Sequence, residues 1–158
     1  MTPIDTAKRN KYIEDGIERL RTKWPQSNYE KGRHGGHLII VPGVLLPKGY
    51  RETICTVLFE APPGFPAAHP DNFYTDIEIR LADLSIPHNT VPYNEPFDFV
   101  NHHGIRISGG GGGNFPAHIW PAWRKCMWWS WHLQMWDPNR SSLYTYMQVI
   151  RQRLNYVK

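Results

Sequence analysis

Cys126 is the residue whose type and neighbours point most directly to chemistry. Arg124 and Lys125 precede it immediately, and five tryptophans lie within the twelve positions 120–131. Cationic neighbours stabilise a thiolate, and the thiolate is the nucleophilic form of cysteine. The setting therefore favours a reactive Cys126, and the alternative is a thiol packed as filler among the tryptophans.

The eight histidines invite a metal or hydrolase interpretation, which their spacing does not support. The chain has no Cys-x-x-Cys, His-x-x-x-His or His-Glu-x-x-His spacing, so we expect no metal site. A cysteine hydrolase would need His132 or His118 within hydrogen-bond reach of the sulfur, and no third member of such a site is evident. The run Gly109–Gly113 lacks the Lys-Ser/Thr end of a phosphate loop, so we interpret it as a hinge or linker. No cofactor is expected.

The N-terminal segment is predicted to be an amphipathic helix. Four apolar residues recur at helical spacing opposite charged residues, and Pro25 ends the pattern. These apolar residues are Ile13, Ile17, Leu20 and Trp24. We expect this face to lie on the core.

Two strands are predicted in the middle of the chain. Thr53–Glu60 is apolar on both faces, as in a central strand, and places Cys55 as a small buried side chain. Phe73–Leu81 alternates between apolar and polar residues and predicts a half-buried strand. Four prolines lie between them in Ala61–Asp71, which predicts a stiff surface loop.

The C-terminal half combines a long irregular stretch with a final helix. Ala82–Ala122 shows no periodic structure, and a tryptophan-rich turn is expected after Cys126. Leu143, Met147, Ile150 and Leu154 then recur at helical spacing, with Ser141 or Ser142 as the N-cap and Arg151, Arg153 and Lys158 near the end, where cations suit the helix dipole. We predict a single α+β domain over residues 1–158: an N-terminal helix, an antiparallel meander of about four strands, a long irregular loop and a C-terminal helix.

Charge and hydropathy narrow the class of protein. The formal net charge is +4, but no cationic run exceeds two residues, so we expect no nucleic-acid partner. No stretch of 18 apolar residues exists and the N-terminus is polar, which predicts neither a membrane span nor a signal peptide. We expect a cytoplasmic protein whose two cysteines are thiols.

Four local motifs, in order along the chain, resemble the ubiquitin-conjugating (UBC) superfamily. The first is Pro62-Pro63-Gly64-Phe65-Pro66, followed by Pro70, between two strands. The others are Cys126 after the long loop, Trp136-Asp137-Pro138 ten residues later, and the helix beginning near Leu143. The resemblance covers nearly the whole chain, and it implies a UBC-like fold in which the irregular loop is the active-site loop.

The chain is most similar to bacterial members of this superfamily, often called family E. They resemble it in Trp129-Ser130-Trp131-His132, then in Trp136, Pro138 and Leu143. The resemblance implies a transferase in ubiquitin-like conjugation, encoded beside a ubiquitin-like protein, a ThiF-type activating enzyme and a JAB-type peptidase, in operons some of which are linked to antiphage defence. Cys126 would accept the ubiquitin-like C-terminus as a thioester and pass it to an amine of a target protein.

The chain departs from this pattern in ways that bear on the site. The His-Pro-Asn motif of eukaryotic members is absent, and His118 and Asn114, eight and twelve residues before Cys126, are the candidates to stabilise the oxyanion. His132 would orient the active-site turn or act as a base, or else it is a buried imidazole bonded to backbone. The alternative function is a catalytically silent UBC-like module that binds or scaffolds the ubiquitin-like protein or its activating enzyme.

Overall fold

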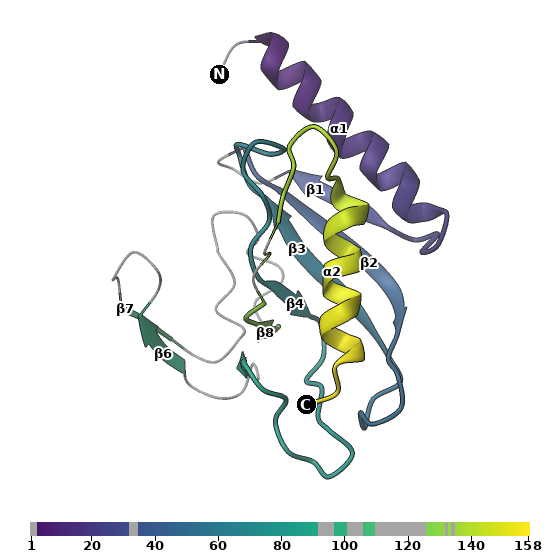
Figure 1. Ribbon diagram of the computed structural model, residues 1–158, viewed down its shortest axis with the longest axis vertical. Helices are drawn as coiled ribbons and strands as arrows, with labels where there is room; N and C mark the ends of the chain where they lie inside the picture. Colours follow the sequence, from purple (N-terminus) through teal and green to yellow (C-terminus); the bar gives the residue numbers. More distant parts are fainter. Residues whose placement is uncertain are drawn as a thin grey trace.

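The protein is an α+β structure in which helices at both ends of the chain pack with an antiparallel sheet of six strands (Figure 1). The computed structural model describes residues 3–31, 35–91, 97–100, 106–109, 126–131, 133 and 135–158. The helices are α1 (Pro3–Arg21) and α2 (Leu143–Asn155). The sheet contains, in spatial order, β1 (Asn28–Lys31), β2 (His37–Leu45), β3 (Ile54–Ala61), β4 (Phe73–Thr75), β8 (Met127–Trp129) and β5 (Thr90–Val91). β6 (Phe97–Val100) and β7 (Arg106–Gly109) form a separate two-stranded sheet.

The first four strands form the predicted meander, since each pairs antiparallel with the next along the chain. β3 lies between β2 and β4, which confirms the prediction of a central strand. Cys55 is buried in the core shared with both helices, as predicted. The pairing of β2 with β3 is interrupted by a bulge between Val41 and Val44.

Both helices follow the sequence periodicity. Ile13, Ile17, Leu20 and Trp24 are all buried in the predicted apolar stripe of α1 and the turn after it. α2 begins after Ser142, whose hydroxyl accepts a hydrogen bond from the Thr145 amide while the Thr145 hydroxyl accepts one from the Ser142 amide. This reciprocal cap identifies Ser142, rather than Ser141, as the N-cap. α2 lies across one face of the sheet (Figure 1).

The predicted strand Phe73–Leu81 is wrong in its extent, because β4 ends at Thr75. The Thr75 hydroxyl donates to the Ile77 carbonyl at 2.9 Å, a local bond that bends the chain. The Asp76 carboxylate also accepts from the Thr56 amide at 2.8 Å. The Asp76 amide still donates to the Thr56 carbonyl at 3.1 Å, but the Asp76 side chain, and not its carbonyl, accepts from the Thr56 amide, and the ladder with β3 stops here.

Two predictions of irregular structure are also wrong in part. The stretch Ala82–Ala122 contains the short strands β5, β6 and β7, and the expected tryptophan-rich turn after Cys126 is the strand β8. β8 pairs with β4 on one side and β5 on the other. Both partners are distant in the chain, so the strand has no local signal beyond the alternation of its own side chains.

Within the described residues, no helix is both long enough and apolar enough to cross a membrane.

Candidate functional site

Cys126 lies on the face of the sheet that points away from the helices. β8 follows it directly, and alternate residues of a strand point to opposite faces. Met127 and Trp129 enter the core beneath the helices, whereas Cys126 packs with Leu38 and Leu58 on the other face. Ile40 and Tyr74 border this second cluster. The sheet itself therefore separates Cys126 from Cys55.

The environment of Cys126 opposes the thiolate. The side chain is 0% exposed. Burial, and secondarily the negative charge of Asp76, raises the pKa of the thiol from 9.0 to about 12. This direction is opposite to the one expected from Arg124 and Lys125, which lie outside the described residues. At neutral pH Cys126 is a protonated, buried thiol, and no disulfide joins it to Cys55.

Two further titratable side chains belong to the face that carries Cys126. Tyr74 has its pKa raised by burial first, and then by the charges of Glu60, Cys126 and Asp71. Burial raises the pKa of Glu60 from 4.5 to about 7. A carboxyl group of that pKa exchanges its proton near neutral pH, which is the property that general acid–base chemistry needs. The sequence did not single out either residue.

The other predicted site residues cannot be placed beside Cys126. His132, His118 and Asn114 all lie outside the described residues, as does most of the run Gly109–Gly113. Within the described part of the chain, His, Cys, Asp and Glu side chains form no group of three or more that would hold a metal ion.

Trp129, part of the motif Trp129-Ser130-Trp131-His132, is held in the core by three contacts. Its ring stacks on Phe73 at 5.4 Å between centroids, and its Nε1 donates to the Thr75 hydroxyl at 3.1 Å. The Arg153 guanidinium lies over the same ring at 4.9 Å. These contacts fix β8 against β4 and α2, and thereby fix the position of Cys126.

Arg153 has a role that its sequence position did not indicate. We expected a cation near the end of α2 that suits the helix dipole, but the side chain is buried. It donates to the carbonyls of His88, Tyr156 and Lys158, at 2.6, 2.9 and 3.2 Å. The arginine therefore joins the last turn of the chain to the segment that enters β5.

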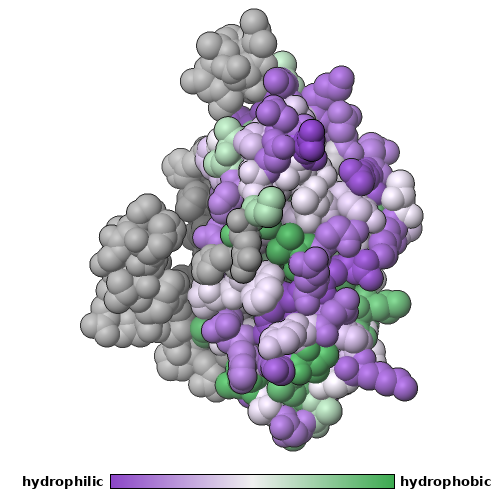
Figure 2. Space-filling view, in the orientation of Figure 1, coloured by the Kyte–Doolittle hydropathy of each residue, from purple (hydrophilic) through white to green (hydrophobic). Residues whose placement is uncertain are grey.

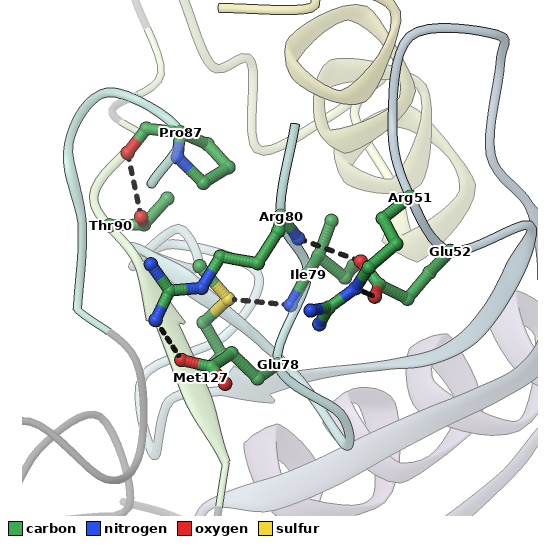
Figure 3. A network of polar contacts seen from close by, with 8 residues as sticks. All are labelled: Arg51, Glu52, Glu78, Ile79, Arg80, Pro87, Thr90 and Met127. Carbon is green, nitrogen blue, oxygen red and sulfur yellow. Dashed lines mark hydrogen bonds and ion pairs between the residues drawn. The ribbon is translucent and has the colours of Figure 1, made fainter. Parts of the chain in front are cut away.

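The segment after β4 is held by polar contacts to β8 and to the turn before β3 (Figure 3). The Ile79 amide donates to the Met127 sulfur at 3.2 Å, and the Arg80 amide donates to Glu52 at 2.7 Å. The Arg80 guanidinium pairs with Glu78 at 2.7 Å. Met127, next to Cys126, is thus fixed by one main-chain hydrogen bond as well as by packing.

Two motifs that are 70 residues apart meet in space. Trp136 Nε1 donates to the Pro66 carbonyl at 2.7 Å, and its ring packs on Phe65 at 5.8 Å between centroids. The proline-rich loop and the Trp-Asp-Pro turn are therefore one structural unit, next to the start of α2.

A basic groove runs beside this unit. It has a volume of about 470 Å³ and lies between α1, the proline-rich loop and the turn before α2. Lys8 and Arg9 line it together with Tyr12 and Phe65, and its described lining includes no carboxylate. Arg9 is 8% exposed and donates to the Pro63 carbonyl, and its Nε has no partner. Such a groove suits an acidic surface of a partner protein.

Comparisons of the chain with protein-family models, with curated proteins and with solved structures found no match.

Proposed function

We propose that this chain is a UBC-like module of a bacterial ubiquitin-like conjugation system, which binds the ubiquitin-like protein or its ThiF-type activating enzyme without carrying a thioester. The observation that carries this choice over an acyl carrier is the buried Cys126 thiol with its pKa of about 12. A carrier's sulfur must reach the carbonyl carbon of the incoming thioester as a thiolate. In this structure the Cys126 sulfur is neither accessible nor ionised.

The assignment to the UBC superfamily rests on the sequence resemblance and on two structural features that agree with it. The N-terminal helix, the meander β1–β4 and the C-terminal helix follow in the expected order. The contact of Trp136 with Pro66 joins two of the motifs on which the resemblance depends.

Binding is assigned to the basic groove beside α1. The groove offers the Lys8 ammonium, the buried Arg9 guanidinium and two aromatic rings, which together suit a partner surface with carboxylates around an apolar centre. The expected partners are the ubiquitin-like protein and the activating enzyme encoded beside this chain; a JAB-type peptidase would act in the same pathway.

A binding measurement tests this assignment. Purified chain would be titrated with each partner by calorimetry, comparing the wild type with Lys8→Glu in the groove and with Lys48→Glu as an exposed control of equal charge change. We expect Lys8→Glu to weaken binding about ten-fold, because a glutamate in the groove would repel the carboxylates of the partner. Lys48→Glu lies outside the groove and should change binding little. Equal effects of the two variants would show that the groove is not the binding surface.

A thioester carrier on Cys126 is the second candidate. Cys126 directly precedes β8, which pairs with β4 through Met127–Trp129. In that reaction the Cys126 sulfur displaces the activating enzyme's sulfur from the carbonyl carbon, and a target amine then displaces Cys126 to form an amide.

A non-reducing gel separates the two candidates. The chain is mixed with activating enzyme, ATP and ubiquitin-like protein, once the activating enzyme itself is shown to be charged. A binding module gives no reductant-sensitive band. A band that disappears with reductant and in Cys126→Ala, and that resists reductant in Cys126→Ser because an oxyester forms, establishes the carrier.

A further inference from the structure

β2 has an unpaired edge over its second half. β1 pairs with residues 37–40 of β2 and no further, the last pair being Asn28 with Ile40. A β1 that began earlier in the chain would continue beside Val41–Leu45. Instead, the residues from Trp24 to Ser27 form a turn that connects α1 to β1. Among the described residues, β3 is the one strand that pairs with Val41–Leu45.

A hollow of about 180 Å³ occupies the place where β1 would have continued. It is formed by the end of α1, the second half of β2 and α2, and its lining is Lys23, Trp24, Gly43, Val44, Leu45 and Arg151. The lining of this hollow shares no residue with the basic groove or with the cluster around Cys126, so its interpretation does not depend on the proposed function.

Two cations flank the indole at the base of the hollow. Lys23 Nζ lies 5.3 Å and the Arg151 guanidinium 5.9 Å from the centroid of the Trp24 ring. The lining contains no carboxylate, and within the described residues neither cation has an ion pair. The hollow is therefore positively charged and is not neutralised from within the described structure.

Exposed apolar side chains lie at the same edge, on the face of the sheet opposite to that of Val44 and Cys55. Leu45 is 75% exposed and Ile54, its partner across the β2–β3 ladder, is 50% exposed. The side of the molecule on which α2 lies is mainly hydrophilic, with hydrophobic areas between (Figure 2). Adjacent apolar and cationic groups favour a ligand that offers carboxylates and apolar side chains together.

The backbone adds a third element of recognition. The Leu46 amide donates to the Thr53 carbonyl at 2.9 Å, so Leu46 directs its polar groups toward β3. Consecutive residues of a strand direct these groups to opposite edges, so the N–H and C=O of Leu45 point away from β3, toward the open edge. Gly43, with φ of 76°, forms the bulge beside them.

We propose that this edge binds an extended acidic segment of a partner protein, which adds a short strand beside Val41–Leu45. Its backbone pairs with Leu45, its carboxylates lie near Lys23 and Arg151, and its apolar side chains cover Leu45. This is strand addition to a sheet edge, in which main-chain bonds provide affinity and alternate side chains provide specificity.

The test uses the full chain and a fluorescein-labelled eight-residue peptide of alternating Glu and Val, measured by fluorescence anisotropy at low salt. An alternating Lys and Val peptide controls for charge. The Glu–Val peptide with alternate amides methylated controls for main-chain pairing. The protein variants are Lys23→Glu with Arg151→Glu, and the matched control Lys11→Glu with Arg140→Glu, both members of which are exposed. Should the first pair reduce folding, Lys23→Gln with Arg151→Gln replaces it.

We expect the Glu–Val peptide to bind the wild-type chain. Its affinity should be about ten-fold weaker for the Lys23/Arg151 variant, since two exposed ion pairs contribute about a factor of ten, and should change little for the control variant. The Lys–Val and methylated peptides are expected not to bind. Failure of the Glu–Val peptide to bind, equal binding of the Lys–Val or methylated peptide, or equal losses in both double variants would overturn the proposal. A dimer of the chain alone that is lost in the Lys23/Arg151 variant would also overturn it, because a second copy would then occupy the edge.

Discussion

The protonation of Cys126 gives the sharpest test of the site. The thiol pKa is raised from 9.0 to about 12, mainly by burial. At pH 8 a thiol of pKa 9.0 is about a tenth ionised, whereas a thiol of pKa about 12 is ionised in about one molecule in 10⁴. The thiolate population of Cys126 is therefore about 10³ lower than that of an exposed cysteine, before any steric protection is counted.

The assay is alkylation by iodoacetamide, followed by mass spectrometry. Cys55→Ala leaves Cys126 as the one cysteine of the chain, and Cys126→Ala leaves Cys55, whose pKa burial also raises to about 12. Each variant would be labelled at pH 8, both folded and in denaturing urea. Because iodoacetamide reacts with the thiolate, we expect each folded variant to react at least about 10³ more slowly than its unfolded form.

One result would refute this reasoning. If folded Cys126 were labelled within about ten-fold of the unfolded rate while Cys55 stayed protected, the thiol would be accessible and ionised. The burial argument would then fail, and the thioester carrier would become the better assignment. Equal, strong protection of both cysteines supports the binding module.

Three changes of stability follow from other contacts. Glu60→Gln should raise the free energy of unfolding at pH 8 on the order of 1–3 kcal/mol and leave it nearly unchanged at pH 4. The raised pKa means that the folded state favours the protonated carboxyl. The stability that Glu60 contributes is therefore fully present below pH 4.5 and is lost as the pH rises through about 7. Urea titrations at both pH values, with exposed Glu30→Gln as the control, check this, and an equal effect at pH 4 would contradict it. Gly16→Ala should cost about 1–3 kcal/mol because an added Cβ would lie 2.8 Å from Leu143 Cδ1, where α1 meets α2; an unchanged melting temperature would show that the helices separate freely. Arg153→Met should cost about 2–4 kcal/mol because three carbonyls lose their donor; Arg151→Met in the same helix is the control, and equal losses would mean that the buried contacts of Arg153 contribute little.

The sequence by itself determined the elements whose signals are local. Helical spacing located α1 and α2 with their buried faces, since a helix repeats within a few residues. The run Thr53–Glu60, apolar on both faces, identified the central strand β3 and the burial of Cys55. The α+β order of a helix, a meander and a helix followed from these elements.

The tertiary structure decided everything that depends on pairing between distant segments. β8 exists because β4 and β5 bind it on both sides, and β4 ends at Thr75, where the Asp76 carboxylate, in place of a main-chain carbonyl, accepts from the Thr56 amide 20 residues earlier. The chemistry of Cys126 changed for the same reason. Burial against Leu38 and Leu58, which are remote in the sequence, raises the pKa of the thiol because desolvation disfavours the charged form. Arg124 and Lys125, from which the sequence predicted a stabilised thiolate, lie outside the described residues.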